Sequence, residues 1–413
     1  MNDISLDWCK AQDTADPLKG FQSRFDLPKG VIYMDGNSLG PLPIGVKERL
    51  AQVVAKEWGT DLIKSWNSAD WINLPTRVGA KIAALIGAQS HEVVMADSTS
   101  VNLFKVAAAA CKMRPGRKQI LSEPGNFPTD LYMMQGLTDF LGADYRLDTV
   151  PRADIAGAIT EETAVVLLTQ VHYISADMLD MAAITKAAHD KGALIIWDLS
   201  HSAGAVPVDL GAAGADFAVG CGYKYLNGGP GAPAFLYVAE RHLNSVQQPL
   251  TGWFGHADPF EFEDDYAPSP SIKRMLVGTT GILAASALDS ALDAFTDVDM
   301  DAIRRKSVSL TGLFIQLVET RLVDFGLGLA TPKDSARRGS HVSLTHENGF
   351  AVMQALIEYG VIGDFRAPNF LRFGITPLYL GYEDIYLAIE KLADILETGI
   401  WREARFNQKS AVT

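Results

Sequence analysis

Cysteine is scarce in this chain: three of its 413 residues are cysteine, namely Cys9, Cys111 and Cys221, and no two of them form a CxxC pair. A disulfide scaffold needs an even set of cysteines, and a thiolate metal site needs clustered ones. The sequence therefore argues against a disulfide-stapled domain and predicts no metal site. Such cysteine usage is typical of cytoplasmic proteins, and we expect a cytoplasmic location.

Long hydrophobic runs and a basic surplus are also missing. No stretch reaches the roughly 18 uninterrupted apolar residues of a membrane span, and residues 1–13 lack the basic start and apolar core of a secretory signal. Acidic residues outnumber basic ones by 49 to 36, which gives a formal net charge of −13. Nucleic acid and anionic membranes would repel such a chain, so we expect neither as a partner. A local basic pocket for an acidic small molecule remains compatible with this charge.

Apolar residues are plentiful, at 48%, and the chain is longer than one hydrophobic core usually serves. Between about residues 80 and 240, helical patterns alternate with short apolar runs, the pattern of a mostly parallel sheet buried on both faces. After that region come a long helical pattern and two strand-like runs, "SHVSLT" and "FLRFGIT". The predicted division is an N-terminal segment with a linking helix at 1–60, a large α/β domain at 61–297 and a small C-terminal α+β domain at 298–413.

Two predicted strand ends carry side chains suited to a bound ligand. Thr99 and Ser100 stand where the strand "EVVMA" turns into a helix, and hydroxyls with free backbone N–H groups form an anion site there. The plain alternative is a helix cap. After the strand "KQILSE" a Pro/Gly-rich loop carries Asn126, Phe127 and Asp130, and its aromatic ring can stack on a planar ligand or simply pack on the surface.

Two further strand ends carry an acid and an amine. Asp198 ends the very apolar strand "ALIIW", and a carboxylate buried there needs a partner. Lys224, in "GYKYLNGGPG", follows the next strand, so both residues are expected at one edge of the sheet. An amine shielded from water loses its proton more readily and becomes a nucleophile. The alternatives are a turn cap for the acid and a solvent-facing loop position for the lysine.

Together the four strand ends offer phosphate donors, an aromatic face, a buried acid and an amine. Pyridoxal phosphate needs this set, because it has an anionic group, a flat ring, a pyridine nitrogen and an aldehyde. The sequence therefore predicts a pyridoxal-phosphate site at the carboxyl edge of the sheet.

The motifs resemble those of the kynureninase family, pyridoxal-phosphate enzymes of the aspartate-aminotransferase-like (type I) fold. The resemblance covers nearly the whole chain and includes "YMDGNSLGPLP", "STSVNLF", "NFPTD", "WDLSHSAGAVPVDL", "GYKYLNGGPG", "GWFGH", "RRKSVSLTG" and "LRFGITPLY". The Asp–Lys spacing alone fits the broader group with cysteine desulfurases and aminotransferases. "DGNSLG" together with "GYKYLN…GWFGH" is more specific.

By this resemblance, Lys224 forms the Schiff base with the cofactor, Asp198 pairs with its pyridine nitrogen, and Arg372 holds the substrate's α-carboxylate. Tyr223 is implied as a proton relay and as part of the phosphate shell. The remaining implied cofactor contacts are Thr99, Ser100, Phe127, Asp130, Thr169, His201, Trp253 and Thr279, the last reaching in from a partner subunit.

The implied reaction is hydrolytic cleavage of the Cβ–Cγ bond of L-kynurenine to anthranilate and L-alanine, in tryptophan catabolism, by a homodimer. Some family members carry asparagine where Thr279 aligns, and that residue is linked to a ring hydroxyl of the substrate. Its absence favours kynurenine over 3-hydroxykynurenine.

Three alternatives stay open. A desulfurase needs a nucleophilic cysteine in the C-terminal half, and all three cysteines lie at or before residue 221. An aminotransferase would share the fold and cofactor. A non-catalytic descendant is expected to have lost Lys224 or Asp198, and both are present.

Overall fold

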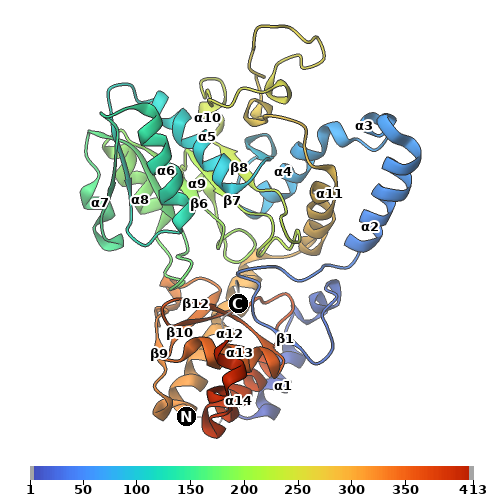
Figure 1. Cartoon of the computed structure of the whole chain (residues 1–413), viewed down its shortest axis with the longest axis vertical. Helices are drawn as coiled ribbons and strands as arrows, with labels where there is room; N and C mark the ends of the chain where they lie inside the picture. The colour runs from blue at the N-terminus through green and yellow to red at the C-terminus, as the bar shows by residue number, and fades with distance from the viewer. Residues whose placement is uncertain (1–3, 409–413) are drawn as a thin grey trace. The chain divides into compact units, whose positions relative to one another are not determined.

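The computed structural model describes residues 4–408 and divides into two compact units (Figure 1). The large unit contains Val46–His172 and Leu179–Leu292, and the small unit contains Met1–Gly45, Tyr173–Met178 and Asp293–Thr413. The boundary near residue 292 lies close to the end of the predicted large domain. Residues 46–60, predicted as part of an N-terminal segment, belong to the large unit, and the short segment 173–178 belongs to the small one.

A seven-stranded sheet forms the centre of the large unit, in the order β2-β8-β7-β6-β5-β3-β4. Its strands are β2 (Val93–Met95), β3 (Gln119–Ser122), β4 (Arg146–Thr149), β5 (Thr163–Thr169), β6 (Leu194–Asp198), β7 (Phe217–Gly220) and β8 (Phe235–Val238). The predicted mostly parallel sheet is confirmed, because β4, β3, β5, β6 and β7 run parallel.

One strand runs against the others. β8 is antiparallel to both β7 and β2, so β2 again points the same way as β7. The carboxyl ends of β2, β3, β5, β6 and β7 therefore meet at one edge of the sheet, where parallel sheets gather their ligands. The four strand ends singled out in the sequence all belong to this edge.

Helices cover the sheet (Figure 1). α5 packs against β5 to β8 and against α6, while α8 packs against β6, α7 and α9. The strands are buried because their runs of Val, Leu and Ile face helices on both sides, as in Val165, Leu167 and Ile196. The helices of this unit are α2 (Val46–Gln52), α3 (Ser65–Ser68), α4 (Leu74–Leu85), α5 (Thr99–Lys112), α6 (Pro128–Leu141), α7 (Ile155–Ala158), α8 (Met181–Asp190), α9 (Leu210–Ala213), α10 (Glu240–Leu243) and α11 (Ile282–Ala291).

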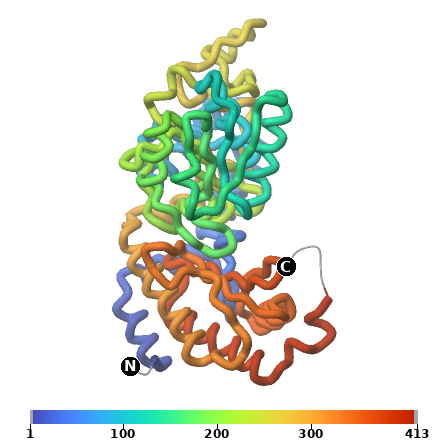
Figure 2. The backbone as a smooth tube through the Cα atoms, turned by 90° about the vertical axis from the view of Figure 1, so that its left-hand side faces the viewer, coloured from blue at the N-terminus to red at the C-terminus, as the bar shows by residue number. Residues whose placement is uncertain are grey.

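The small unit joins the two ends of the chain. The predicted α+β character is confirmed by an antiparallel sheet of order β12-β13-β10-β9, and a parallel pair joins β1 to β11. The N-terminal helix packs against the last long helix, as the blue and red segments show in Figure 2. The elements are α1 (Leu6–Ala15), β1 (Ile32–Tyr33), α12 (Met300–Arg321), β9 (Gly328–Leu329), β10 (His341–Thr345), α13 (Gly349–Glu358), β11 (Val361–Ile362), β12 (Asp364–Arg366), β13 (Phe370–Gly374) and α14 (Tyr382–Thr398).

Across residues 4–408, every helix is too short or too polar to cross a membrane.

Candidate active site

Lys224 lies in the loop after β7, and only 9% of its surface is exposed. Its Nζ lies 3.0 Å from Nε2 of His201, which follows β6. The same amine lies 5.6 Å from the ring centroid of Phe127 and 5.8 Å from that of Tyr223. The structure therefore brings three other predicted site residues together around the Lys224 amine.

Asp198 is the last residue of β6 and is 3% exposed. Its Oδ1 accepts a 2.8 Å hydrogen bond from the Ser200 N–H, and its Oδ2 lies 3.5 Å from Oγ1 of Thr169. Burial raises the pKa of Asp198, while the hydrogen bond from Ser200 and the charge of Lys224 oppose that rise. A cationic group beside this carboxyl would favour its ionised form. The position therefore suits a ligand that carries a positive charge.

Thr169, at the end of β5, connects Asp198 to a second buried acid. Its Oγ1 lies 2.6 Å from Oδ1 of Asn126 and 3.3 Å from Oδ2 of Asp130. Burial, followed by the charge of Asp198, raises the pKa of Asp130 well above the usual range. The other oxygen of Asp130, Oδ1, is buried and has no hydrogen-bond partner among residues 4–408.

This group of residues fits pyridoxal phosphate. A buried polar atom left unpaired costs about 1–3 kcal/mol, so the Oδ1 atom of Asp130 indicates that a ligand completes the group. Phe127 is 39% exposed and offers a ring face, Asp198 offers a carboxyl group, and Lys224 offers an amine. These are the contacts that a flat pyridine ring with an aldehyde requires.

The start of α5 has the features expected of a phosphate cradle. Ser98 caps the helix, because its Oγ accepts a 3.3 Å hydrogen bond from the Val101 N–H, so the cap alternative holds for this residue. The hydroxyls of Thr99 and Ser100 follow directly and make no hydrogen bond within the described residues. They remain available, together with the positive end of the helix dipole, for an anion.

An ion pair between a buried lysine and a partly exposed aspartate, which the sequence analysis missed, holds the turn into this helix. Asp97 has φ 45°, a conformation uncommon for residues other than glycine. Lys105, fully buried in α5, donates a 2.7 Å hydrogen bond to Oδ2 of Asp97 and another of 2.7 Å to the carbonyl of Met275. The signal in the sequence was a lysine inside an otherwise apolar helical pattern.

Two of the other predicted phosphate contacts, Trp253 and Thr279, are more exposed than Thr99 and Ser100. Trp253, in the 3-10 helix η7 (Trp253–Gly255), is 41% exposed, and Thr279 lies exposed in the segment before α11. Tyr223 is half-buried, and burial raises its pKa, so its phenol keeps its proton at neutral pH. Tyr223 can therefore donate a proton or a hydrogen bond.

Arg372 belongs to the small unit, in β13, and is 2% exposed. Its Nε donates a 2.7 Å hydrogen bond to Oδ1 of Asp364, and its Nη2 pairs with the other carboxylate oxygen. Its Nη1 donates to the carbonyl of Tyr173 at 2.6 Å. The arginine therefore does pair with a local acid, and any substrate carboxylate would have to approach the opposite, Nη1/Nη2 edge of the guanidinium.

Two more groups of the small unit surround this pair. Ser38 donates a 2.7 Å hydrogen bond to Oδ2 of Asp364 and lies 3.3 Å from Nη2 of Arg372. Burial, and then the charge of Asp364, raises the pKa of Asp35 to about 7. Sequence reasoning assigned no role to Ser38, Asp35 or Asp364, although the first two lie in the "DGNSLG" motif.

Comparison with known proteins decides the family. A kynureninase of Deinococcus radiodurans is 54% identical over 399 residues, which cover 95% of this chain and 97% of that protein. The chain belongs to the kynureninase family. A kynureninase of Pseudomonas fluorescens is 50% identical and covers 98% of this chain. The family model for the kynureninase C-terminal domain matches residues 303–392.

Solved structures agree with the fold of this kynureninase-family chain. The cysteine desulfurase of Thermococcus onnurineus NA1 superposes with a TM-score of 0.77 at 19% identity, over 92% of this chain and 98% of that one. The cysteine desulfurase CsdA of Escherichia coli gives 0.76 at 20% identity, over 92% and 98%. At this identity the likeness shows the fold alone.

Proposed function

We propose that this protein is a pyridoxal-phosphate-dependent kynureninase, a hydrolase that cleaves the Cβ–Cγ bond of L-kynurenine to give anthranilate and L-alanine in tryptophan catabolism. The observation that carries the proposal is the buried Lys224 amine, with Asp198 and Phe127 at the same sheet edge, in a chain about half identical to curated kynureninases.

The residues of the large unit would hold the cofactor as follows. Lys224 would bind its aldehyde, Asp198 its pyridine nitrogen, and Phe127 its ring face, while Thr99 and Ser100 would hold its phosphate. The remaining contacts proposed are Asp130, Thr169, His201, Tyr223, Trp253 and Thr279. When bound, pyridoxal phosphate withdraws electrons from the substrate's α-carbon and so weakens the neighbouring bonds.

Protons would be moved by two neighbouring groups. The Lys224 amine, once free and unprotonated, could take the α-proton, and His201, which lies within hydrogen-bond distance, could accept a proton from it. Tyr223, whose phenol stays protonated, can return a proton to the alanine-forming carbon. The carboxylate of Asp198 would keep the pyridine nitrogen protonated.

The small unit would bind the amino-acid end of the substrate. Arg372 would offer its Nη1/Nη2 edge, where a carboxylate would take over or share the contacts to the Tyr173 carbonyl and Ser38, and the bidentate pair with Asp364 fixes the plane of the guanidinium. Asp364 is thus a positioning residue, and Ser38 supports it by donating to the same carboxylate.

A homodimer in the cytoplasm is the assembly we propose. The segment between η7 and the 3-10 helix η8 (Ile272–Met275) projects from the large unit in both views (Figures 1 and 2). It carries Phe260 and Phe262, which are 58% and 76% exposed next to Trp253. A second copy would cover these rings and place its Thr279 at the phosphate.

The test is incubation of the purified holoenzyme with L-kynurenine, followed by anthranilate fluorescence and alanine analysis. Equal amounts of both products support the proposal. Amino-group transfer to a keto acid without anthranilate would support an aminotransferase instead, and sulfide release from cysteine would support a desulfurase.

A further inference from the structure

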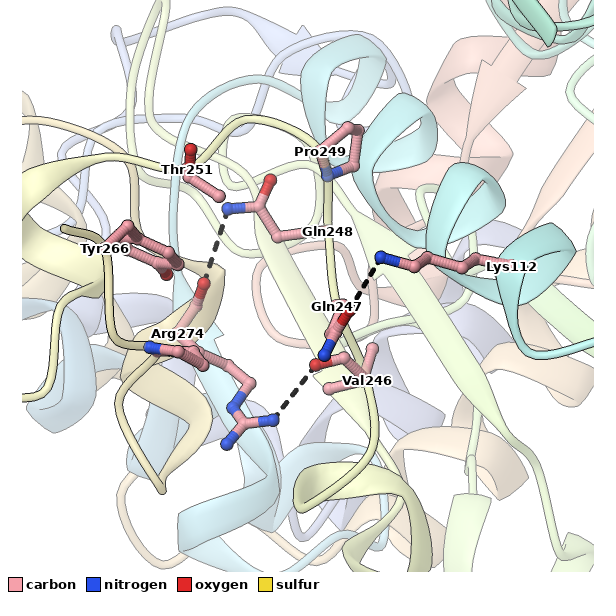
Figure 3. A pocket seen from close by; sticks show the side chains of 9 residues that line it. Lys112, Val246, Gln247, Gln248, Pro249, Thr251, Tyr266 and Arg274 are labelled. Atoms are coloured by element: carbon pink, nitrogen blue, oxygen red, sulfur yellow. Dashed lines mark hydrogen bonds between the residues drawn. The ribbon is translucent and has the colours of Figure 1, made fainter.

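A cavity of about 340 Å³ opens in the large unit, between the end of α5, residues 246–251 and residues 266–274. Figure 3 shows Lys112 reaching it from α5 and Arg274 from the opposite side. The proposed cofactor and substrate contacts do not include any residue of its lining. The cavity is therefore a separate feature of the molecule.

Arg274 is a buried cation without an acidic partner. Only 7% of it is exposed, and its Nε and Nη1 donate to the carbonyls of Ser269 and Val246 at 2.7 and 3.0 Å. Within residues 4–408 it forms no ion pair, and its Nη2 makes no hydrogen bond. Burial lowers the pKa of this guanidinium, and the group that opposes this is the phenol of Tyr266 rather than a carboxylate. A buried charge of this kind is costly unless an anion accompanies it.

The cavity lining carries no carboxylate, although acidic residues outnumber basic ones in the chain. Two other cavities are acidic: one is lined by Asp13, Asp16, Glu383 and Asp384, the other by Asp258, Glu263 and Asp264. Lys112 adds a second positive charge at the rim, and its Nζ lies 2.6 Å from Oε1 of Gln247. The cavity is thus a local basic pocket in an acidic protein.

The walls indicate what kind of anion fits. Val246, Pro249 and Pro268 supply apolar surface, and Thr251 supplies a hydroxyl. A planar guanidinium edge matches a carboxylate, and apolar walls favour an apolar body behind it. We propose that this pocket binds a small organic carboxylate at a second site, distinct from the catalytic one.

The test is a calorimetric titration of the holoenzyme with benzoate, with benzamide as the neutral counterpart. Benzoate is expected to bind, and benzamide to bind at least tenfold more weakly. Lys112→Glu reverses the charge at the rim and should weaken benzoate binding about fivefold or more. The matched control is Lys191→Glu, the same change at an exposed lysine outside the lining.

The variants also separate this site from the catalytic one. An aromatic carboxylate held at the catalytic site should not respond to Lys112→Glu more strongly than to Lys191→Glu, because Lys112 lines this cavity and neither lysine is a proposed cofactor or substrate contact. Arg274→Gln should weaken benzoate at least tenfold; if it does not fold, Lys112→Glu decides. Unchanged affinity in Lys112→Glu, equal effects of the two lysine variants, or equal binding of benzamide would overturn the proposal. Kynurenine turnover by Lys112→Glu should remain normal.

Discussion

Lys224 is held out of water by aromatic rings and His201 rather than by an ion pair with a nearby carboxylate. Its side chain therefore contributes little to stability, and Lys224→Ala should fold normally while losing all kynurenine turnover. Peptide mapping after borohydride reduction of the wild-type holoenzyme should find the pyridoxyl group on this lysine. A reduced cofactor on another lysine would remove Lys224 from its assigned role.

Arg372 has two tasks that mutation can separate. Arg372→Ala should lower kcat/KM by about 30-fold to a few thousand-fold, the cost of losing one partner of a buried charge pair. Arg372→Ala also leaves the Asp364 carboxylate buried without this partner, and breaking such a buried pair lowers the free energy of unfolding by about 3–5 kcal/mol. Because Asp364 keeps its contact to Arg366, we expect a loss of stability at the lower end of that range. Adding Asp364→Asn should restore the melting temperature without restoring kcat/KM.

The kinetics of two variants test whether Arg372 binds the substrate. Wild-type kcat/KM in Arg372→Ala would remove this arginine from the substrate site. Arg372→Lys should recover little activity, because it keeps the charge and loses the planar fork.

Asp35 should make stability depend on pH. Its pKa is raised from 3.8 to about 7, so between these values the folded state keeps a proton that the unfolded state has lost. The contribution of Asp35 to the free energy of unfolding is therefore complete below about pH 4 and is lost as the pH rises to about 7. With about 1.4 kcal/mol per pH unit, the loss is at most about 4 kcal/mol. The free energy of unfolding of Asp35→Asn relative to wild type should therefore rise from pH 4 to 7 and level off; a flat difference would refute this.

At the scale of elements, the start of α5 depends on the pair between Lys105 and Asp97. Lys105→Met removes a cation from beneath the helix N-terminus and frees a backbone turn with positive φ. We expect the concentration of pyridoxal phosphate for half-saturation to rise about five- to tenfold, equivalent to about 1 kcal/mol. Lys112→Met, an exposed change in the last turn of the same helix, is the control and should leave it unchanged.

The strands and their shared edge could be predicted from the sequence, because short continuous apolar runs such as those of β5 and β6 are typical of strands buried on both faces of a sheet. The antiparallel direction of β8 could not, since its apolar run looks the same in either direction. Helix α2 continues as a π-helix, η2 (Val53–Asp61), which no periodicity indicated. The pair between Asp364 and Arg372 depends on the register of β12 against β13, which places the two residues opposite each other.

At the scale of the whole molecule, the substrate preference tests how far the family resemblance extends. Kynurenine should be preferred over 3-hydroxykynurenine, because Thr279 stands where some family members carry asparagine. Comparing the two kcat/KM values decides this. Thr279→Asn is the matched variant and should shift the ratio toward the hydroxylated substrate; a wild-type preference for that substrate would show that the inference is wrong.

The small unit is assembled from the first residues of the chain, a short middle segment and the last residues. Ile32 pairs with Val361, and Asp13 accepts hydrogen bonds from the backbone of Tyr382 and Glu383. During synthesis, the N-terminal part of the small unit can therefore fold only after its C-terminal part has been made. All residues of the large unit, in contrast, have been synthesised once residue 292 has emerged from the ribosome. Every proposed cofactor contact except the partner subunit's Thr279 is thus synthesised before Arg372, so a nascent chain would be able to bind pyridoxal phosphate before it could recognise an amino acid.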